Sequence, residues 1–324
     1  MKAIVQDRYG PPELLRYAEV ERPAPAGGEV LVRVRAAALN HGDRVDLRGN
    51  PSIARLALGV RRPRIPILGR AVAGTVEAAG TGVTALRPGD EVFGETVKRG
   101  FAEYVAVPAT DLAVKPAGLT FEQAATLPVA ATTALQALRL AGADGGASRR
   151  VLVNGASGGV GTFAVQLAAH FGHEVTAVCS ARNAERATAL GAARVVDYAR
   201  EDVTRGTDRF DVVVDLAGGH PLAAMRRVLT AGGVYIASTG NGGPVLGPVP
   251  RLLAVLTSAP LRGGRLRVLT NRRSAEDLAT LAALVEAGRL TPYVERTRPL
   301  SETADALRVL ETEHARGKTV LIVA

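Results

Sequence analysis

The chain has 324 residues, of which 47% are hydrophobic, so it is long enough for about two domains with separate cores and is not a disordered chain. Its formal net charge of +9 comes from basic residues scattered singly, so we expect no nucleic-acid partner. A single cysteine excludes a disulfide framework or a multi-cysteine zinc site and indicates a reducing compartment, which we take to be the cytoplasm.

The first 124 residues predict a mostly antiparallel β domain, here expected to be a barrel. Short segments with period-two alternation are separated by Pro and Gly, and we expect strands at 3–5, 29–35, 74–79, 91–93 and 102–107. A helical stretch over 120–141 then leads into a region of different character, where strands and helices alternate.

The segment from 150 to 172 predicts a strand, a glycine-rich turn and a helix in immediate succession. Val151 to Val153 form the apolar strand, and Gly172 ends the helix. This order is the context that a dinucleotide-binding fingerprint requires, although a purely structural tight turn is the alternative. The residues expected to bind the cofactor pyrophosphate, or to allow its approach, are Ala156, Ser157, Gly158, Gly159, Val160 and Gly161.

The end of the next predicted strand, 174–179, bears on which nicotinamide cofactor is used. Chains that bind NAD carry a carboxylate about 20 residues past the glycine loop, whereas this chain has Ser180 and Arg182. A hydroxyl and a guanidinium suit a 2′-phosphate, so we expect NADPH. The alternative is that Arg182 is a solvated side chain before a helix capped by Asn183. Tyr198, at the end of the following strand, is expected to line the adenosine end of the cofactor.

The alternation continues to about residue 269. We expect strands at 195–198, 210–216, 234–238 and 266–269, a helix at 184–190, and a second helix at 221–229 that is closed by Gly232-Gly233. Continuous apolar strands between helices predict a parallel sheet buried on both faces. The apolar, proline-broken segment Val245–Leu261 is expected to form a pocket wall or lid and not a membrane span.

The tail adds helices at 275–287 and 302–314 and a last strand at 319–323. We expect the tail to return to the first domain, because the parallel sheet is complete without it. The predicted domains are therefore a catalytic domain, 1–124 completed by about 270–324, and a nucleotide-binding domain, 125–269.

Several short sequence motifs are spread along the whole chain, and their order is informative. They are MKAIVQDRYGPPELL at the N-terminus, ALNHGD at 38–43, the runs 66–76, 87–94 and 100–104, Leu127-Pro128, TAL at 133–135, NGASGGVG at 154–161 and RGKTV at 316–320. With them the chain resembles the zinc-independent quinone oxidoreductase branch of the medium-chain dehydrogenases/reductases, which includes zeta-crystallin-like and reticulon-4-interacting-protein-like reductases. The resemblance implies an α/β protein with a GroES-like, mostly antiparallel β-barrel domain and a Rossmann doubly wound parallel-sheet domain.

The resemblance also bears on zinc. Zinc-dependent relatives would need a cysteine where Asn40 stands and a His-Glu pair where Arg70-Ala71 stands. We therefore expect no metal site. His41 is the nearest other candidate ligand, and a lone histidine is more often a packing or hydrogen-bonding residue.

Carried over position by position, the resemblance places Asn40 and Thr133 near the nicotinamide and its ribose and Ser157–Val160 at the pyrophosphate. Ser180, Arg182 and Tyr198 would serve the 2′-phosphate end, and Lys318 would lie near the cofactor. The alternatives are helix packing for Thr133 and a turn role for Asn40.

One position departs from the family pattern. Many relatives have a tyrosine five residues after the asparagine, and this chain has Val45. Asp43, His41, Asp46 and water remain open as proton donors, and we expect Asn40, Asp43 and Thr133 to act in catalysis.

The expected activity is NADPH-dependent reduction of a quinone or an activated carbon–carbon double bond, because such acceptors need neither zinc nor a strong acid. A catalytically idle NADPH-binding sensor is the alternative. The apolar segment 245–261 and the insert 50–64 suggest a bulky hydrophobic substrate. A homodimer or homotetramer is expected, with 266–269 as the edge strand available for pairing.

Overall fold

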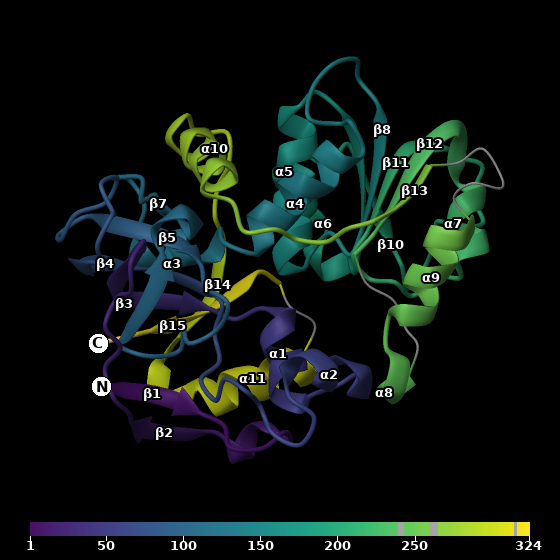
Figure 1. Ribbon diagram of the computed structural model, residues 1–324. Coiled ribbons are helices and arrows are strands. Elements are labelled where there is room, and N and C mark those ends of the chain that lie inside the picture. The colour runs from purple at the N-terminus through teal and green to yellow at the C-terminus, as the bar shows by residue number, and fades with distance from the viewer. Residues whose placement is uncertain (239–242, 259–264, 314–315) are drawn as a thin grey trace. The chain divides into compact units, whose positions relative to one another are not determined.

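The computed structural model describes residues 1–238, 243–258, 265–313 and 316–324. The chain divides into two compact units (Figure 1): Met1–Thr132 together with Arg273–Ala324, and Thr133–Arg272. The sequence predicts boundaries at 124/125 and about 269/270, whereas the structure has them at 132/133 and 272/273. The first unit is thus built from segments on both sides of the second.

The first unit contains a seven-stranded sheet in the order β14-β15-β3-β4-β5-β7, with β6 pairing β3. Alternating residues of β3 and β4, such as Val30, Val32 and Val76, are buried in its core. Among the described strands of this sheet, β14 and β15 pair in parallel and the other pairs are antiparallel. A separate antiparallel pair, β1 with β2, precedes the sheet. The strands are β1 (Lys2–Val5), β2 (Arg16–Glu19), β3 (Glu29–Ala38), β4 (Ala71–Ala79), β5 (Glu91–Glu95), β6 (Tyr104–Pro108), β7 (Leu112–Val114), β14 (Val294–Pro299) and β15 (Lys318–Ile322).

The pairing of β15 with β3 positions the candidate site of this unit. Val320 lies opposite Ala38, and the Leu39 N–H donates to the Thr319 carbonyl at 2.9 Å. The start of β15 therefore lies beside the end of β3, where helix α1 (His41–Arg48) begins. The other helices of the unit are α2 (Arg55–Leu58), α3 (Phe121–Thr126), α10 (Ala275–Glu286) and α11 (Thr303–Thr312), with short 3-10 turns at Pro12–Leu14, Ser52–Ala54, Ala109–Asp111 and Leu300–Glu302.

The single helical stretch expected over 120–141 is two helices, α3 and α4 (Ala130–Leu140). Pro128 has no N–H to continue a helix, and Val129 adopts a left-handed conformation with φ of 66°. A β-branched residue in this region is unusual, and here it marks the break between the helices.

The second unit contains a six-stranded parallel sheet in the order β10-β9-β8-β11-β12-β13. Numbered within the unit, this is the 3-2-1-4-5-6 order of the Rossmann fold. The fold class predicted from sequence, an antiparallel β domain plus a doubly wound parallel-sheet domain, is confirmed. The strands are β8 (Arg150–Asn154), β9 (Glu174–Cys179), β10 (Arg194–Asp197), β11 (Phe210–Asp215), β12 (Leu229–Ala237) and β13 (Arg265–Val268). The helices are α4, α5 (Gly159–His170), α6 (Ala184–Ala189), α7 (Leu222–Arg227), α8 (Gly243–Leu246) and α9 (Val249–Ser258), with a 3-10 turn at Ala181–Asn183.

The prediction that Gly232-Gly233 closes the helix over 221–229 was wrong, because α7 ends at Arg227 and both glycines lie inside β12. A bulge in the pairing of β11 with β12 falls here, between the pairs at Phe210 and Val212. A Cβ atom at Gly233 would lie 2.9 Å from the Phe210 carbonyl oxygen, so glycine permits the close approach of the two strands. The apolar segment 245–261 contains α9 and part of α8, and its residues 259–261 lie outside the described residues.

Candidate functional site

The glycine-rich turn lies at the carboxyl end of β8, between that strand and α5. Gly155 has a φ of 92°, and the Ala156 N–H donates to the Val178 carbonyl of the neighbouring strand at 3.0 Å. Gly158 then caps α5 in an extended conformation, with no side chain bonded to the first turn of the helix. The N–H groups of that first turn point out of the helix end and suit an anion such as a pyrophosphate.

Gly158 and Gly161 of this turn are glycine for different reasons. A Cβ atom at Gly161 would clash with the Gly155 carbonyl oxygen and lie 2.7 Å from the Ala156 carbonyl carbon, so close packing of the helix against the loop requires glycine there. A Cβ atom at Gly158 would lie 3.5 Å from the nearest atom, again the Gly155 oxygen. The fold therefore tolerates alanine at Gly158, and a bulky ligand approaching the backbone is the remaining reason for glycine.

We expect Gly158→Ala and Gly161→Ala to separate these roles. The free energy of unfolding of the G158A variant should lie within about 0.5 kcal/mol of wild type. The variant should nevertheless bind a dinucleotide at least about tenfold more weakly, because its methyl group displaces a charged ligand from the N–H groups. The G161A variant should lose about 1–3 kcal/mol of stability from overpacking. Thermal unfolding and a fluorescence titration with the dinucleotide check both variants, and normal dinucleotide binding by a folded G158A would contradict the assignment.

The residues expected at the 2′-phosphate follow the two neighbouring strands β9 and β10. Ser180 precedes the 3-10 turn that contains Arg182, and the Asn183 amide donates to the Ser180 hydroxyl at 3.0 Å. Asn183 also caps α6, but its side chain makes no capping bond there. Tyr198 follows β10, where its N–H donates to the Cys179 carbonyl at 3.3 Å, and its side chain is 52% exposed. Serine, arginine and an accessible tyrosine thus occur together at the carboxyl end of the sheet.

Three atoms of Asn40 form hydrogen bonds to other residues of the first unit. Lys318 Nζ donates to Asn40 Oδ1 and to the Leu39 carbonyl oxygen, each at 2.5 Å. The Asn40 Nδ2 amide donates to the Ala38 carbonyl at 3.0 Å, and the Asn40 N–H donates to Asp43 Oδ2 at 2.7 Å. Asp43 is the third residue of α1, so this last bond closes the first turn of the helix. The side chain of Asn40 therefore has a fixed orientation, with one amide hydrogen left for a ligand.

Burial shifts the pKa values of Asp43 and Lys318, the two ionisable residues that contact Asn40. It raises the pKa of Asp43 to about 7, against the opposing effect of the bond from the Asn40 N–H. It lowers the pKa of Lys318 to about 8, against the opposing charge of Asp43. Asp43 has no exposed surface, and its Oδ1 has no hydrogen-bond partner within the described part of the chain. Asp43 is therefore better suited to positioning Asn40 than to contacting a substrate.

Comparisons with known proteins agree with these features. An alcohol dehydrogenase GroES-like domain matches residues 26–117, and a zinc-binding dehydrogenase domain matches residues 190–321. The mitochondrial NAD(P)H oxidoreductase RTN4IP1 of Mus musculus is 33% identical, with 100% of this chain and 89% of the relative covered. The NADPH-dependent alkenal/one oxidoreductase of Arabidopsis thaliana chloroplasts is 33% identical, with 99% and 79% covered. The quinone oxidoreductase of Coxiella burnetii superposes with a TM-score of 0.88 at 32% identity, with 100% and 99% covered.

The chain belongs to the quinone oxidoreductase branch of the medium-chain dehydrogenases/reductases. It is accordingly an oxidoreductase that uses a nicotinamide cofactor and a small-molecule substrate. No helix in the described residues is long and apolar enough to cross a membrane. Relatives with mitochondrial and chloroplastic names leave the cytoplasmic location a prediction.

Asp46, one of the proton donors left open by the sequence, is a buried counter-ion in this oxidoreductase. Its Oδ2 accepts from Arg70 Nη2 at 2.7 Å and from Arg70 Nε at 3.1 Å, and its Oδ1 lies 3.4 Å from Lys98 Nζ. Both oxygens of this buried carboxylate face cations, so Asp46 is not free to contact a substrate. Arg70 therefore takes a structural role where zinc-dependent relatives need histidine, and no group of three or more metal-ligating side chains occurs among the described residues.

Three other residues singled out in the sequence are His41, Val45 and Thr133. His41 begins α1 and is exposed, and Val45 lies one turn further along the same helix. Thr133 lies in the first turn of α4, nearly buried, and is the first residue of the second unit. Contacts with the nicotinamide remain predictions for Asn40 and Thr133, as do the roles of the pyrophosphate and 2′-phosphate residues.

Sequence reasoning missed a second buried cluster, around Asp215 at the carboxyl end of β11. Asp215 Oδ2 accepts from Tyr235 Oη and from Arg251 Nη2, each at 2.6 Å, and Oδ1 accepts from Asn154 Nδ2 at 2.8 Å. Arg251 also donates to the His220 carbonyl at 2.5 Å. Burial and the neighbouring Asp215 raise the pKa of the Tyr235 hydroxyl. Arg251 thus ties α9 to the end of the parallel sheet, and only its place in an apolar segment distinguished it in the sequence.

Proposed function

We propose that this oxidoreductase uses NADPH, without zinc, to reduce a quinone or the activated carbon–carbon double bond of a hydrophobic substrate. The observation that carries the proposal is the Asn40 amide, fixed by Lys318 at the position where zinc-dependent relatives need a cysteine. A hydrogen-bond donor at this position can orient a bound group but cannot act as a Lewis acid. We assign Asn40 and Thr133 to the nicotinamide end of the cofactor.

The chemistry of these acceptors fits the side chains present. Bound NADPH would supply the hydride, and the enolate or oxyanion then formed on the acceptor needs only water or a weak acid for protonation. Val45 replaces the usual tyrosine, Asp46 is locked in ion pairs, and Asp43 is buried. His41, at the start of α1, and water are therefore the proposed proton donors. Two relatives support an enone acceptor by name, an alkenal/one oxidoreductase and the 2-methylene-furan-3-one reductase of Solanum lycopersicum.

The reaction is tested by adding phenanthrenequinone or a simple enone to the purified protein with NADPH and following the loss of NADPH absorbance. We expect turnover that is unchanged by a chelator, with no stoichiometric zinc by elemental analysis. Oxidation of secondary alcohols without reduction of either acceptor would overturn the proposal, as would a dependence on zinc.

The preference for NADPH is tested at Arg182. We expect Arg182→Gln to lower kcat/KM for NADPH about tenfold and to leave NADH unaffected, because only NADPH carries the 2′-phosphate that a guanidinium binds. Arg205→Gln removes the same charge from an exposed turn after β10 and should change neither value. Equal losses with both cofactors in R182Q would contradict the assignment.

Val45 favours a second candidate, an NADPH-binding sensor without turnover. This candidate predicts tight NADPH binding and no oxidation of the cofactor across quinones, enones and aldehydes. The acceptor assay above distinguishes the two functions in a single sample.

We also propose a homodimer or homotetramer. β13 is an edge strand of the six-stranded sheet and offers unpaired backbone groups within the described residues. The functional division proposed for the chain is a catalytic unit, from both ends of the sequence, and a nucleotide-binding unit between them.

A further inference from the structure

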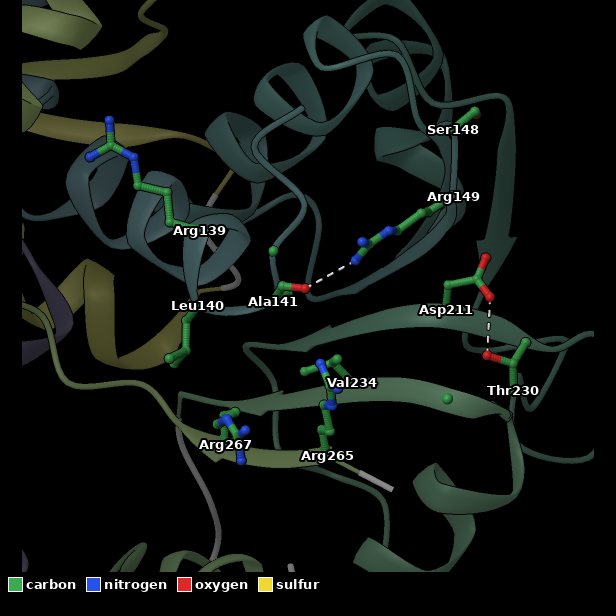
Figure 2. Close-up of a pocket in the computed structure, with 12 residues that line it drawn as sticks. Arg139, Leu140, Ala141, Ser148, Arg149, Asp211, Thr230, Val234, Arg265 and Arg267 are labelled. Carbon is green, nitrogen blue, oxygen red and sulfur yellow. Dashed lines mark hydrogen bonds between the residues drawn. The ribbon is translucent and has the colours of Figure 1, made fainter. Parts of the chain in front are cut away.

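A groove of about 910 Å³ lies on the second unit, and polar and basic side chains dominate its lining (Figure 2). Its walls come from the end of α4, the loop before β8, and the beginnings of β11, β12 and β13. The basic lining residues are Arg139, Arg149, Arg265 and Arg267. Its volume falls in the range of sites that bind small molecules.

The groove lies at the opposite end of the sheet from the glycine-rich turn. The strands are parallel, and β8 runs from Arg150, next to the groove residue Arg149, to Asn154, just before the turn. A strand of this length spans roughly 16 Å at about 3.3 Å per residue. A ligand in the groove would therefore not occupy the proposed pyrophosphate site.

Three of the arginines carry positive charge with no carboxylate beside it. Within the described residues, no ion pair involves Arg149, Arg265 or Arg267, and Arg149 Nη1 donates only to the Ala141 carbonyl, at 3.1 Å. Arg265 and Arg267 are two residues apart on β13 and both exposed, whereas Leu266 between them is buried. They therefore project from the same face of the strand, as Figure 2 shows.

The carboxylate in the groove, Asp211, is already engaged. Its Oδ2 accepts from the Arg150 N–H at 2.9 Å. Its Oδ1 accepts from the Thr230 hydroxyl at 3.0 Å, as Figure 2 shows. Asp211 thus organises the beginnings of the strands and does not pair with the guanidinium groups. The groove keeps an excess of positive charge.

We propose that this groove binds an oligophosphate, either free or as the phosphate chain of a nucleotide, at a site distinct from that of the redox cofactor. Guanidinium groups bind phosphate oxygens through pairs of parallel hydrogen bonds. Three guanidinium groups that have no carboxylate partner among the described residues are spread along one groove, and they match a chain of phosphates better than a single phosphate. Ser148 also lines the groove, and its hydroxyl is a further hydrogen-bond donor.

The test is isothermal titration calorimetry, which measures the affinity and stoichiometry of binding. The full chain is titrated with tripolyphosphate and with ATP, at low ionic strength and in the presence of saturating NADPH. We expect binding of one tripolyphosphate per chain, weakened at least about tenfold in Arg265→Gln/Arg267→Gln through the lost charge-assisted bonds. The matched control is Arg33→Gln/Arg35→Gln, which removes two exposed arginines with the same spacing from β3 and should leave binding unchanged. Circular dichroism confirms that both variants remain folded.

Each outcome decides the proposal. Tighter binding of ATP than of tripolyphosphate identifies a nucleotide, and equal binding identifies the phosphate chain as the recognised group. Displacement of tripolyphosphate by NADPH would place it at the cofactor site and overturn the proposal. Equal weakening in both double variants, or no binding at low ionic strength, would also overturn it.

Discussion

Replacing Lys318 with methionine is expected to lower kcat/KM for acceptor reduction by roughly 10²-fold, the cost of a small misplacement of a group that orients the reactants. Lys318 Nζ holds both Asn40 Oδ1 and the Leu39 carbonyl, and methionine can do neither. The side chain of Asn40 would then rotate away from its fixed orientation. Steady-state kinetics with NADPH and phenanthrenequinone measures the loss.

A double-mutant cycle distinguishes this positioning role from a general loss of stability. If Lys318 acts through Asn40, the loss in Asn40→Ala/Lys318→Met should be close to that of either single variant, because both remove one interaction. Independent, additive losses would contradict the role. In wild type, any limb of the pH–rate profile near pH 8 that reflects Lys318 should disappear in K318M.

The same residue predicts a pH dependence of stability. Folding lowers the pKa of Lys318 from 10.5 to about 8, so between these values the unfolded chain binds more protons than the folded chain. Stability of the wild type relative to K318M should therefore rise as the pH increases from about 8 towards 10.5. Urea unfolding at several pH values measures the difference.

Asp215→Ala is expected to destabilise the second unit by about 3–5 kcal/mol, the cost of leaving a buried charge without its partner. Arg251 would lose its carboxylate while its side chain stays only 9% exposed, and Tyr235 and Asn154 would lose an acceptor. Tyr235→Phe should cost about 1 kcal/mol, because it removes one hydroxyl. Urea unfolding of the full chain, followed at the transition of this unit, measures both.

Two further variants test this interpretation. Leu253→Ala, on the same helix as Arg251 and 54% exposed, should change stability by less than about 0.5 kcal/mol. Asp215→Ala/Arg251→Met should be more stable than the sum of the single losses predicts, since the orphaned charge is removed. An additive double variant would show that the ion pair does not hold α9 to the sheet.

The parallel sheet was predictable because the residue pattern of each segment favours the same strand or helix that the fold requires there. Its apolar strands, the glycine-rich turn and the intervening helices occur in the order that the Rossmann topology needs. The break at Val129 was missed because the apolar periodicity continues on both sides of Pro128, although a proline inside a helical pattern indicates a break. β14 also escaped prediction, since its sequence VERTRP lacks apolar alternation and its pairing is supplied by β15.

The residues of the candidate site were predictable one by one, but their connections were not. Asn40 and Lys318 are 278 positions apart, and their contact depends on the register between β3 and β15. Lys98 and Arg251 likewise meet their carboxylates only in the folded chain. Periodicity and motifs report local structure, whereas these contacts arise from tertiary packing.

The interleaving of the two units has a consequence for synthesis of the protein. Because the ribosome makes a chain from its N-terminus, residues 133–272 are all available before β15 exists. The second unit, to which we assign nucleotide binding, can therefore close its sheet while the first unit still lacks β15 and Lys318, which holds the Asn40 amide. We expect a nascent chain to become able to bind its coenzyme before it can reduce an acceptor.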